Sequence, residues 1–441
     1  MRILFLITIC FTLSIFSQNK TLSLNDAISI GLSNSKILVI AESKVNLQKA
    51  KVWESSSLML PQLKLNASYS LLSEVPPFEI KLPTMPSPIT LQEPITNAYV
   101  LRLGIQQPIF TGFRLLSQKS MNDYNRESSE YEYVNEINEE AAKIVSAYLN
   151  FYKSLKLKIL FENNFKLIDK HLYNTKEFLK NGMASKSDVL KLEVQKSNIK
   201  IKMIEATNMV DINRSLLNKT IGIDISEFTL IDTVLNISIN RQYDFADIFE
   251  QAISNRNDIK SMNSKLNAVS KLASISKAGY YPNIYLSSNY YYNRPNQRIF
   301  PNRDQFDDTW DIGISLSWDI WNWGQTSAQV TQANETFKQT ENLNKLLVES
   351  IKIEVLNNYL TLNSSLEKIK AAETSIESAK ENYRIISEKY SVQLATSTDL
   401  IEASNLLLQA ETEYMNSLVD LEIAGMKLDK SIGKKLYNSY E

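Results

Sequence analysis

The chain has 441 residues, with 48 Lys and Arg against 49 Asp and Glu, and its net charge of −1 gives no electrostatic indication of nucleic-acid binding. One cysteine, Cys10, and one histidine, His171, exclude a disulfide framework and a multi-histidine metal centre and argue against Ser-His-Asp catalysis. Ten glycines and eleven prolines are too few for the turns of a barrel or doubly wound enzyme. We therefore expect no enzyme and no cofactor.

Residues 1–17 have the features of a secretory signal peptide. A short positive start precedes an almost wholly apolar stretch that ends at Phe16, and Ser17 is a small residue at a plausible cleavage point. Cys10 follows Ile9 inside the apolar stretch, which does not fit a lipoprotein signal. We expect an exported chain, and the rest of the sequence has no apolar run long enough for a membrane-spanning helix.

A first repeat is predicted over residues 18–220. It should contain an N-terminal helix, strands at about 62–72 and 98–107, and a long helical hairpin at about 113–220. Apolar and polar side chains alternate along the strands, and this alternation is typical of transmembrane barrel strands. A soluble sheet with one face on a core has the same alternation, so both interpretations stay open at this point.

Long helices are predicted because the two commonest helix breakers are absent. Neither glycine nor proline occurs from Phe113 to Asn181 or from Gln325 to Ala424. The apolar positions from Val355 to Tyr390 have a mean spacing of about 3.5 residues, which is the coiled-coil period. A helix over 113–181 would be about 100 Å long, over three times the thickness of a bilayer core.

The sequence is a tandem repeat. The strand Leu63–Tyr69 follows a Leu-Pro pair, and Ile284–Tyr290 follows a Tyr-Pro pair, while Ala184–Leu190 matches Ala395–Ile401. The second repeat is predicted over 244–430. Its strands lie at about 283–292 and 309–319, and its helical hairpin lies at about 324–430; a linker at 221–243 and a C-terminal tail at 431–441 complete the chain.

Four strands cannot close a barrel alone, because the smallest barrels have about eight. A membrane interpretation therefore requires several copies of the chain, and three copies with four strands each would supply twelve. The alternative is a secreted, non-membrane coiled-coil structural or interaction protein whose hairpins pack on each other. A rod of that kind has no need for strands with an apolar outward face and terminal aromatic residues.

The chain resembles the outer membrane efflux protein family, the TolC-like outer membrane factors. The resemblance rests on the order and duplication of short segments: LSLNDA at 22–27, LPQL at 60–63, QPIFTG at 107–112, and the breaks at 181–188 and 392–399. It implies a homotrimer with a twelve-stranded outer-membrane β-barrel and a periplasmic α-barrel of coiled-coil helices. It further implies an exit duct for a tripartite efflux pump or a type I secretion system, served by a periplasmic adapter (membrane fusion) protein and an inner-membrane transporter.

The resemblance also implies functional residues at the two helix breaks. The adapter of such proteins docks at the hairpin tips, which correspond here to Gly182, Met183, Ala184 and Ser187 and to Leu394, Ala395 and Thr398. Acidic residues of the family line the closed periplasmic end, and a tyrosine takes part in holding it shut. The corresponding gate residues are Asp399, Glu402, Tyr390 and Asp188.

Two positions depart from the family pattern. Gln393 occupies the place where the second tip usually has glycine, and Ala395 replaces the arginine that usually partners the tyrosine. Simpler interpretations of the same residues also stand. Ser185 with Asp188, and Thr396 with Asp399, fit capping boxes that restart a helix.

Other side chains have structural alternatives as well. Asp399 and Glu402 share a helix face, which fits either an acidic constriction or a solvated surface. Trp318, Trp321 and Trp323 fit an interfacial aromatic girdle or simple core packing. His171 fits an ordinary surface or seam position in the first long helix.

Overall fold

The computed structural model describes residues 21–81, 83–92, 94–232 and 243–438. The predicted signal peptide with Cys10, part of the linker and the last residues of the tail lie outside the described residues. The described chain forms two compact units. Unit 1 comprises residues up to 40, 134–257 and from 349 onward, and unit 2 comprises residues 41–133 and 258–348.

The two helical hairpins have helices of equal length. The hairpins pair a helix of 67 residues with one of 35 residues in each repeat. The first repeat contains α1 (Leu24–Asn34), α2 (Lys36–Ser57), α3 (Arg114–Lys180) and α4 (Lys186–Thr220). The second contains α5 (Phe245–Asn255), α6 (Asn257–Lys277), α7 (Gln325–Ser391) and α8 (Ser397–Ser431). The prediction of a mainly α tandem repeat is confirmed.

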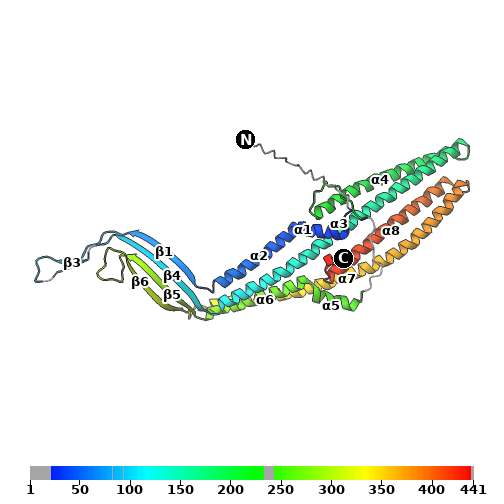
Figure 1. Ribbon diagram of the computed structural model, residues 1–441. Helices are drawn as coiled ribbons and strands as arrows, with labels where there is room; N and C mark the ends of the chain where they lie inside the picture. The colour runs from blue at the N-terminus through cyan, green and yellow to red at the C-terminus, as the bar shows by residue number, and fades with distance from the viewer. Residues whose placement is uncertain (1–20, 82, 93, 233–242, 439–441) are drawn as a thin grey trace, which may run out of the picture. The chain divides into compact units, whose positions relative to one another are not determined.

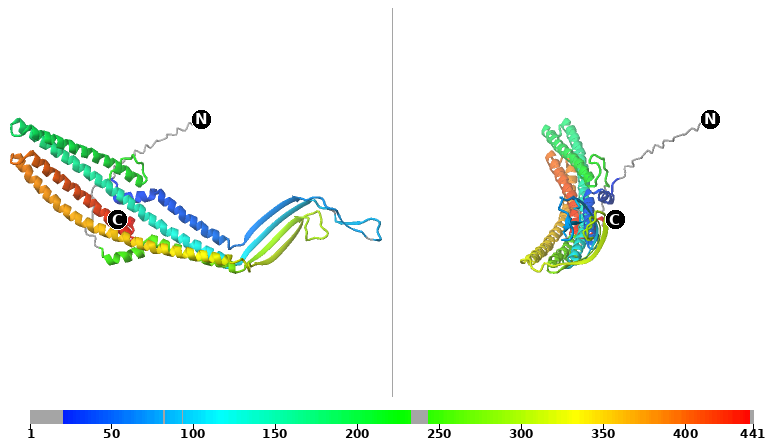
Figure 2. Two further views of the ribbon diagram at one scale, coloured as in Figure 1. Left: turned by 180° about the vertical axis from the view of Figure 1, so that it is seen from behind. Right: turned by 90° about the vertical axis from the view of Figure 1, so that its left-hand side faces the viewer.

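The repeats are not themselves the compact units. Unit 1 combines helices of both repeats, because the two helical hairpins pack on each other (Figures 1 and 2). Its main core holds Tyr148 and Phe151 of α3, Leu217 of α4 and Met426 of α8, with Ala27 of α1 packed among them. Apolar packing of α8 against α3 and α4 therefore joins parts of the chain that the sequence places in different repeats.

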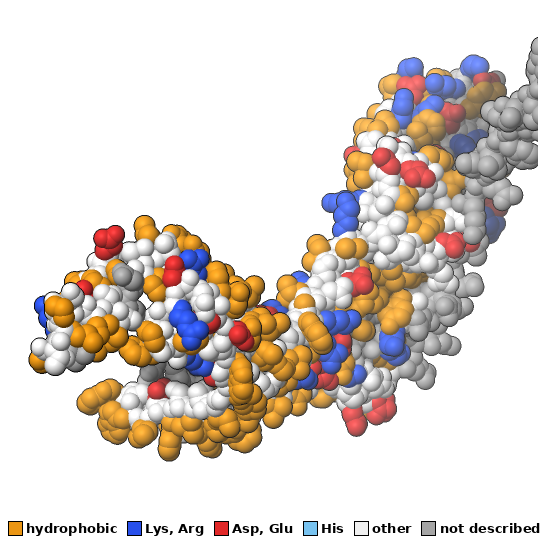
Figure 3. Space-filling model, turned by 60° about the vertical axis from the view of Figure 1, so that its left-hand side comes forward, with side chains coloured by type: hydrophobic (Ala, Val, Ile, Leu, Met, Phe, Trp, Pro, Cys, Tyr) orange, Lys and Arg blue, Asp and Glu red, His pale blue; other side chains and the backbone are white. Residues whose placement is uncertain are grey.

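Unit 2 contains a four-stranded antiparallel sheet in the order β1-β4-β5-β6, so that β1 and β6 are its edges. The strands are β1 (Gln62–Leu71), β4 (Asn97–Thr111), β5 (Asn283–Arg294) and β6 (Asp307–Ser317). Hydrophobic side chains gather along one side of this part of the molecule in Figure 3. From Leu63 to Leu71 every residue of β1 is exposed, so neither face of this strand rests on a core.

The strand bounds differ from the expected ones. The second strand extends to Thr111 rather than about 107, because it continues along β5 past Gln106, where its pairing with β1 stops. Pro108 fits there, since its missing N–H falls beyond the pairing with β1. The last strand ends at Ser317, which leaves Trp318 outside it.

The loop between the first two sheet strands holds structure that the sequence did not predict. β2 (Phe78–Ile80) and β3 (Ile89–Gln92) form a small antiparallel hairpin. The expected four strands per chain are therefore the strands of the main sheet, and the hairpin is additional. Proline-rich composition concealed it, because proline is uncommon in strands.

In the part of the chain that the structure describes, no helix is long and apolar enough to cross a bilayer.

Candidate functional site

The two hairpin tips, residues 181–188 and 392–399, have the same backbone turn. Gly182 has a φ of 70° and Gln393 a φ of 64°, both in the left-handed region. The amide of Met183 donates to the carbonyl of Phe178 at 2.8 Å, and the amide of Leu394 donates to that of Lys389 at 2.8 Å. These are the bonds of a Schellman-type helix end. The departure at Gln393 therefore leaves the turn unchanged and places a side chain in a conformation that favours glycine.

A capping box starts the helix after each tip, as the local pattern predicts. The amide and hydroxyl of Ser185 donate to the carboxylate of Asp188 at 2.9 and 2.6 Å. In the second tip Thr396 donates to Asp399 in the same way, at 2.8 and 2.7 Å. Two acids of the predicted gate are therefore also helix caps.

Direct contacts join the two tips. Asp188 accepts a further hydrogen bond from the hydroxyl of Ser397, which is 2% exposed. Lys191 of α4 donates to the hydroxyl of Thr398 in α8 at 2.9 Å. Hydrogen bonds from Ser185 and then from Ser397 hold the pKa of Asp188 below its usual value. Asp188 thus links the end of one hairpin to the other, a role that nothing in the local sequence indicated.

Tyr390 is 8% exposed and lies between the two hairpins. Its hydroxyl and that of Thr175 in α3 are 2.6 Å apart and share a hydrogen bond, and its ring meets Phe178 edge-on at 6.0 Å. Burial raises the pKa of the hydroxyl. With no arginine at position 395, Tyr390 is held by a threonine within its own chain.

His171 lies one helical turn before Thr175 in the same seam. Its Nε2 is 2.7 Å from the hydroxyl of Tyr383 in α7, and only 7% of the residue is exposed. The pKa of the imidazole is below its usual value, mainly because the ring is buried and secondly because Lys170 is positively charged. Of the two expected positions, the structure therefore places His171 in the seam and not on the surface.

The predicted contact residues at the tips include exposed apolar side chains. Met183 is 50% exposed and Leu394 is 77% exposed, and they occupy corresponding positions of the two tips. Gly182, Ser187 and Thr398 are exposed, while Ala184 and Ala395 are partly covered. The tips therefore offer a matched pair of apolar side chains beside small residues.

Asp399 and Glu402 are both exposed on α8. The backbone amide and hydroxyl of Thr396 hold the pKa of Asp399 below its usual value, so its carboxylate is charged at neutral pH. Glu402 lies one turn further along the helix. Exposure keeps the acidic pair available to ions, and the cap gives Asp399 a structural role as well.

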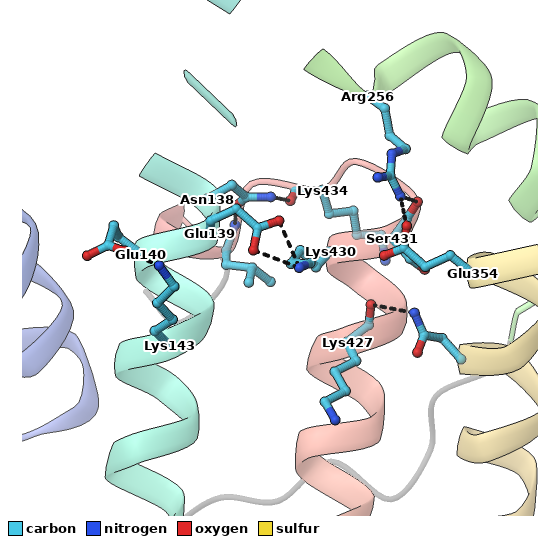
Figure 4. Close-up of polar contacts among 12 residues, drawn as sticks. Asn138, Glu139, Glu140, Lys143, Arg256, Glu354, Lys427, Lys430, Ser431 and Lys434 are labelled. Atoms are coloured by element: carbon cyan, nitrogen blue, oxygen red, sulfur yellow. Dashed lines mark hydrogen bonds and ion pairs between the residues drawn. The ribbon is translucent and has the colours of Figure 1, made fainter. Parts of the chain in front are cut away.

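A polar network at the other end of the hairpins fixes the end of α8 (Figure 4). Glu139 of α3 pairs with Lys430 at 2.8 Å, and Arg256 pairs with Glu354 of α7 at 2.8 Å. Arg256 also donates to the carbonyl of Ser431 at 3.1 Å. Sequence analysis missed this network, because its members come from four separate stretches of the chain.

The tryptophans after β6 are exposed in the single chain: Trp318 by 52%, Trp321 by 75% and Trp323 by 89%. This exposure favours the predicted aromatic girdle over core packing. Among the described residues, no group of three or more His, Cys, Asp or Glu side chains is placed to hold a metal ion.

Comparisons with known proteins agree with this fold. Residues 248–434 match the family model "Outer membrane efflux protein". Two curated relatives are the outer membrane proteins TolC of Vibrio cholerae, 19% identical over 60% of this chain, and of Escherichia coli, 25% identical over 28% of it. The alignments span 61% and 25% of the relatives' own lengths.

Solved structures match nearly the whole chain. The outer membrane protein VceC from Vibrio cholerae superimposes with a TM-score of 0.78 at 16% identity, over 94% of this chain and 96% of that one. CusC superimposes with a TM-score of 0.79 at 15% identity, over 93% and 92%. At these identities the likeness establishes the fold.

The family match over residues 248–434 and the two TolC relatives show that the chain is similar to the outer membrane efflux protein family, the TolC-like outer membrane factors. The matched family and both curated relatives are outer membrane proteins by their names. This is a family of channel proteins and not of enzymes.

Proposed function

We propose that three copies of the chain form an outer-membrane exit duct of a tripartite efflux pump or a type I secretion system. The observation that carries the proposal is the sheet of unit 2, whose edge strands β1 and β6 pair with no further strand among the described residues. An exposed edge is a site for pairing with another chain. Pairing β1 of one copy with β6 of the next would close three four-stranded sheets into one barrel.

The exposed faces of the sheet support this assembly. Leu65 of β1 is 66% exposed, and Ile314 of β6 is 75% exposed. Large apolar side chains of this exposure are unfavourable in water and suit a lipid-facing barrel surface. The secreted rod alternative leaves them without a function.

The long helices offer a second surface for copies of the chain. α4 exposes Val194 by 61% and Ile201 by 56%, and α7 exposes Ile353 by 66% and Leu360 by 56%. In a trimer, the apolar row of α4 would pack against the row of α7 in the neighbouring copy. The helices would then enclose a periplasmic duct continuous with the barrel.

The tips supply the proposed contact with a periplasmic adapter, which would connect the duct to an inner-membrane transporter. Met183 and Leu394 provide apolar contacts, and the acids Asp188, Asp399 and Glu402 lie just behind them. The duct itself would conduct passively, with energy from the transporter.

Matched lysine substitutions test the assembly. Ile314→Lys places a charge on the apolar face of β6 and should cost about 2–4 kcal/mol if that residue meets the bilayer midplane, whereas Ser315→Lys on the polar face should be tolerated. The measurement is the fraction of carbonate-resistant trimer, determined by light scattering corrected for detergent. A wild-type monomer that carbonate releases, or equal effects of both variants, would overturn the proposal.

Adapter docking needs a separate test. Met183→Asp and Leu394→Asp should reduce cross-linking to the adapter encoded by a neighbouring gene and reduce export, while the trimer remains intact. The control is Ile225→Asp, which changes an apolar side chain outside the tips that is 60% exposed. If the tip variants behave like this control, the tips are not the docking site.

A further inference from the structure

The polar face of the sheet carries a cluster of arginines around its centre. Lys64, Gly104, Asn289 and Asp311 lie in one row across the four strands, in the order β1, β4, β5 and β6. Arg102 and Tyr291 are paired two residues away along their strands, in the next row on the same face. Because side chains two apart along a strand share a face, all these residues lie on the same side of the sheet.

Asn289 is the centre of this cluster and is only 7% exposed. Its side-chain carbonyl accepts from Nε and Nη2 of Arg102 at 3.0 and 2.8 Å. Its side-chain amide donates to the Asp311 carboxylate at 2.7 Å. The carbonyl end of this buried asparagine thereby fixes the orientation of Arg102, while its amide end holds Asp311.

Space for this asparagine depends on Gly104. A Cβ at position 104 would lie 2.8 Å from the side-chain oxygen of Asn289, closer than real Cβ contacts. The cluster is therefore a built arrangement and not a chance meeting of flexible side chains.

The ring of Tyr291 lies close to two guanidinium groups. Arg102 is 5.7 Å and Arg298 is 5.3 Å from its centroid. Arg298 also pairs with Asp311 at 2.8 Å. An aromatic ring beside a guanidinium restrains it and leaves the N–H groups without a partner in the described part of the chain, such as those of Arg102 Nη1, available to an anion.

Positive charge is in excess on this face. Lys64 and Arg102 have no carboxylate partner within the described residues, and Asp311 is already paired with Arg298. The basic side chains of the cluster are Lys64, Arg102 and Arg298. The acidic ones are Asp311 and Asp307, which lies nearer the loop between β5 and β6, so the count is three against two. Both Lys64 and Arg102 are exposed.

We propose that Lys64, Arg102 and Arg298, with Tyr291, form an anion-recognition ring inside the barrel, which favours passage of organic anions that carry aromatic groups. The inference rests on the proposed trimer, in which the polar face lines the lumen and the cluster occurs three times around one axis. A narrow lumen of low-dielectric walls concentrates the resulting positive potential. Arg102 would contact the anion, while Asn289 and Gly104 act as positioning residues.

Planar bilayers with purified trimer in a KCl gradient provide the test. Lys64→Gln combined with Arg102→Gln should shift the reversal potential toward cation selectivity, and Asp311→Asn should shift it the opposite way. The probe for the aromatic anion is 8-hydroxypyrene-1,3,6-trisulfonate. Its half-blocking concentration should rise about tenfold in the Lys64 and Arg102 double variant.

Lys81→Gln with Arg303→Gln is the matched control, since it removes two positive charges from the loops outside the sheet strands. If all variants form conducting trimers with the same reversal potential and the same block, the proposed ring is wrong and the proposed duct is still supported. A change as large in the loop control would also overturn it. A protein that forms no trimer and no channel would refute the duct itself, and with it the ring.

Discussion

Asp188 and Ser397 are 209 residues apart in sequence, and the Ser397 hydroxyl donates a hydrogen bond to the Asp188 carboxylate. The same carboxylate caps α4 through Ser185. One side chain therefore sets the start of a helix and its attachment to the other hairpin.

Removing the Ser397 hydroxyl separates these two roles. Ser397→Ala should keep both helix caps and lose only the contact between tips, at a cost of about 1 kcal/mol. Amide hydrogen exchange near 188 and 397 should then become about fivefold faster. Ser187→Ala, at an exposed site, is the control, and equal exchange in both variants would show that the contact contributes nothing to tip stability.

The left-handed turn at each tip predicts opposite effects for two substitutions. Gln393→Gly should slow hydrogen exchange of the second tip modestly, because relief of left-handed strain of about 1 kcal/mol slightly exceeds the extra entropy that glycine loses. Gly182→Gln should speed exchange in the first tip, where no compensating contact exists. Changes of the same sign in both tips would contradict this account.

His171 predicts a pH dependence of the seam between α3 and α7. Its pKa is lower in the folded protein than the ordinary value of 6.5, so the unfolded state binds more protons near that pH. Stability should therefore be full above pH 6.5 and fall as the pH drops below it. Thermal unfolding of the trimer at pH 7.5 and 5.5 measures the difference.

The chain has one histidine, so His171→Gln removes every imidazole titration. The variant should lose the stability difference between these two pH values. An unchanged difference would assign it to other groups.

The acidic pair predicts separable effects of its two members. Glu402→Gln should reduce cation selectivity and weaken block by multivalent cations in planar bilayers, with no change in exchange at the tip. Asp399→Ala should have the same effect on selectivity and block and should also speed hydrogen exchange at the tip, because it removes the acceptor of the capping bonds from Thr396. If the variant that combines Asp399→Ala with Glu402→Gln has wild-type selectivity and block, the pair is a solvated surface and the constriction lies elsewhere.

The sequence by itself determined the features that depend on neighbours along the chain. The long helices follow from the absence of glycine and proline, and the restart of each helix follows from Ser185 with Asp188 and from Thr396 with Asp399. These interactions span three residues, so the pattern is visible without the fold. The strand pairs followed from alternation and from the duplication of the whole unit.

Only the tertiary structure decided how the repeats combine. The bonds of Tyr390 to Thr175, of His171 to Tyr383 and of Ser397 to Asp188 join stretches more than 200 residues apart. No local pattern specifies such partners, because they depend on which helix faces pack together and in which register. The same reason hid the cluster at Asn289, whose members meet only once four strands have aligned.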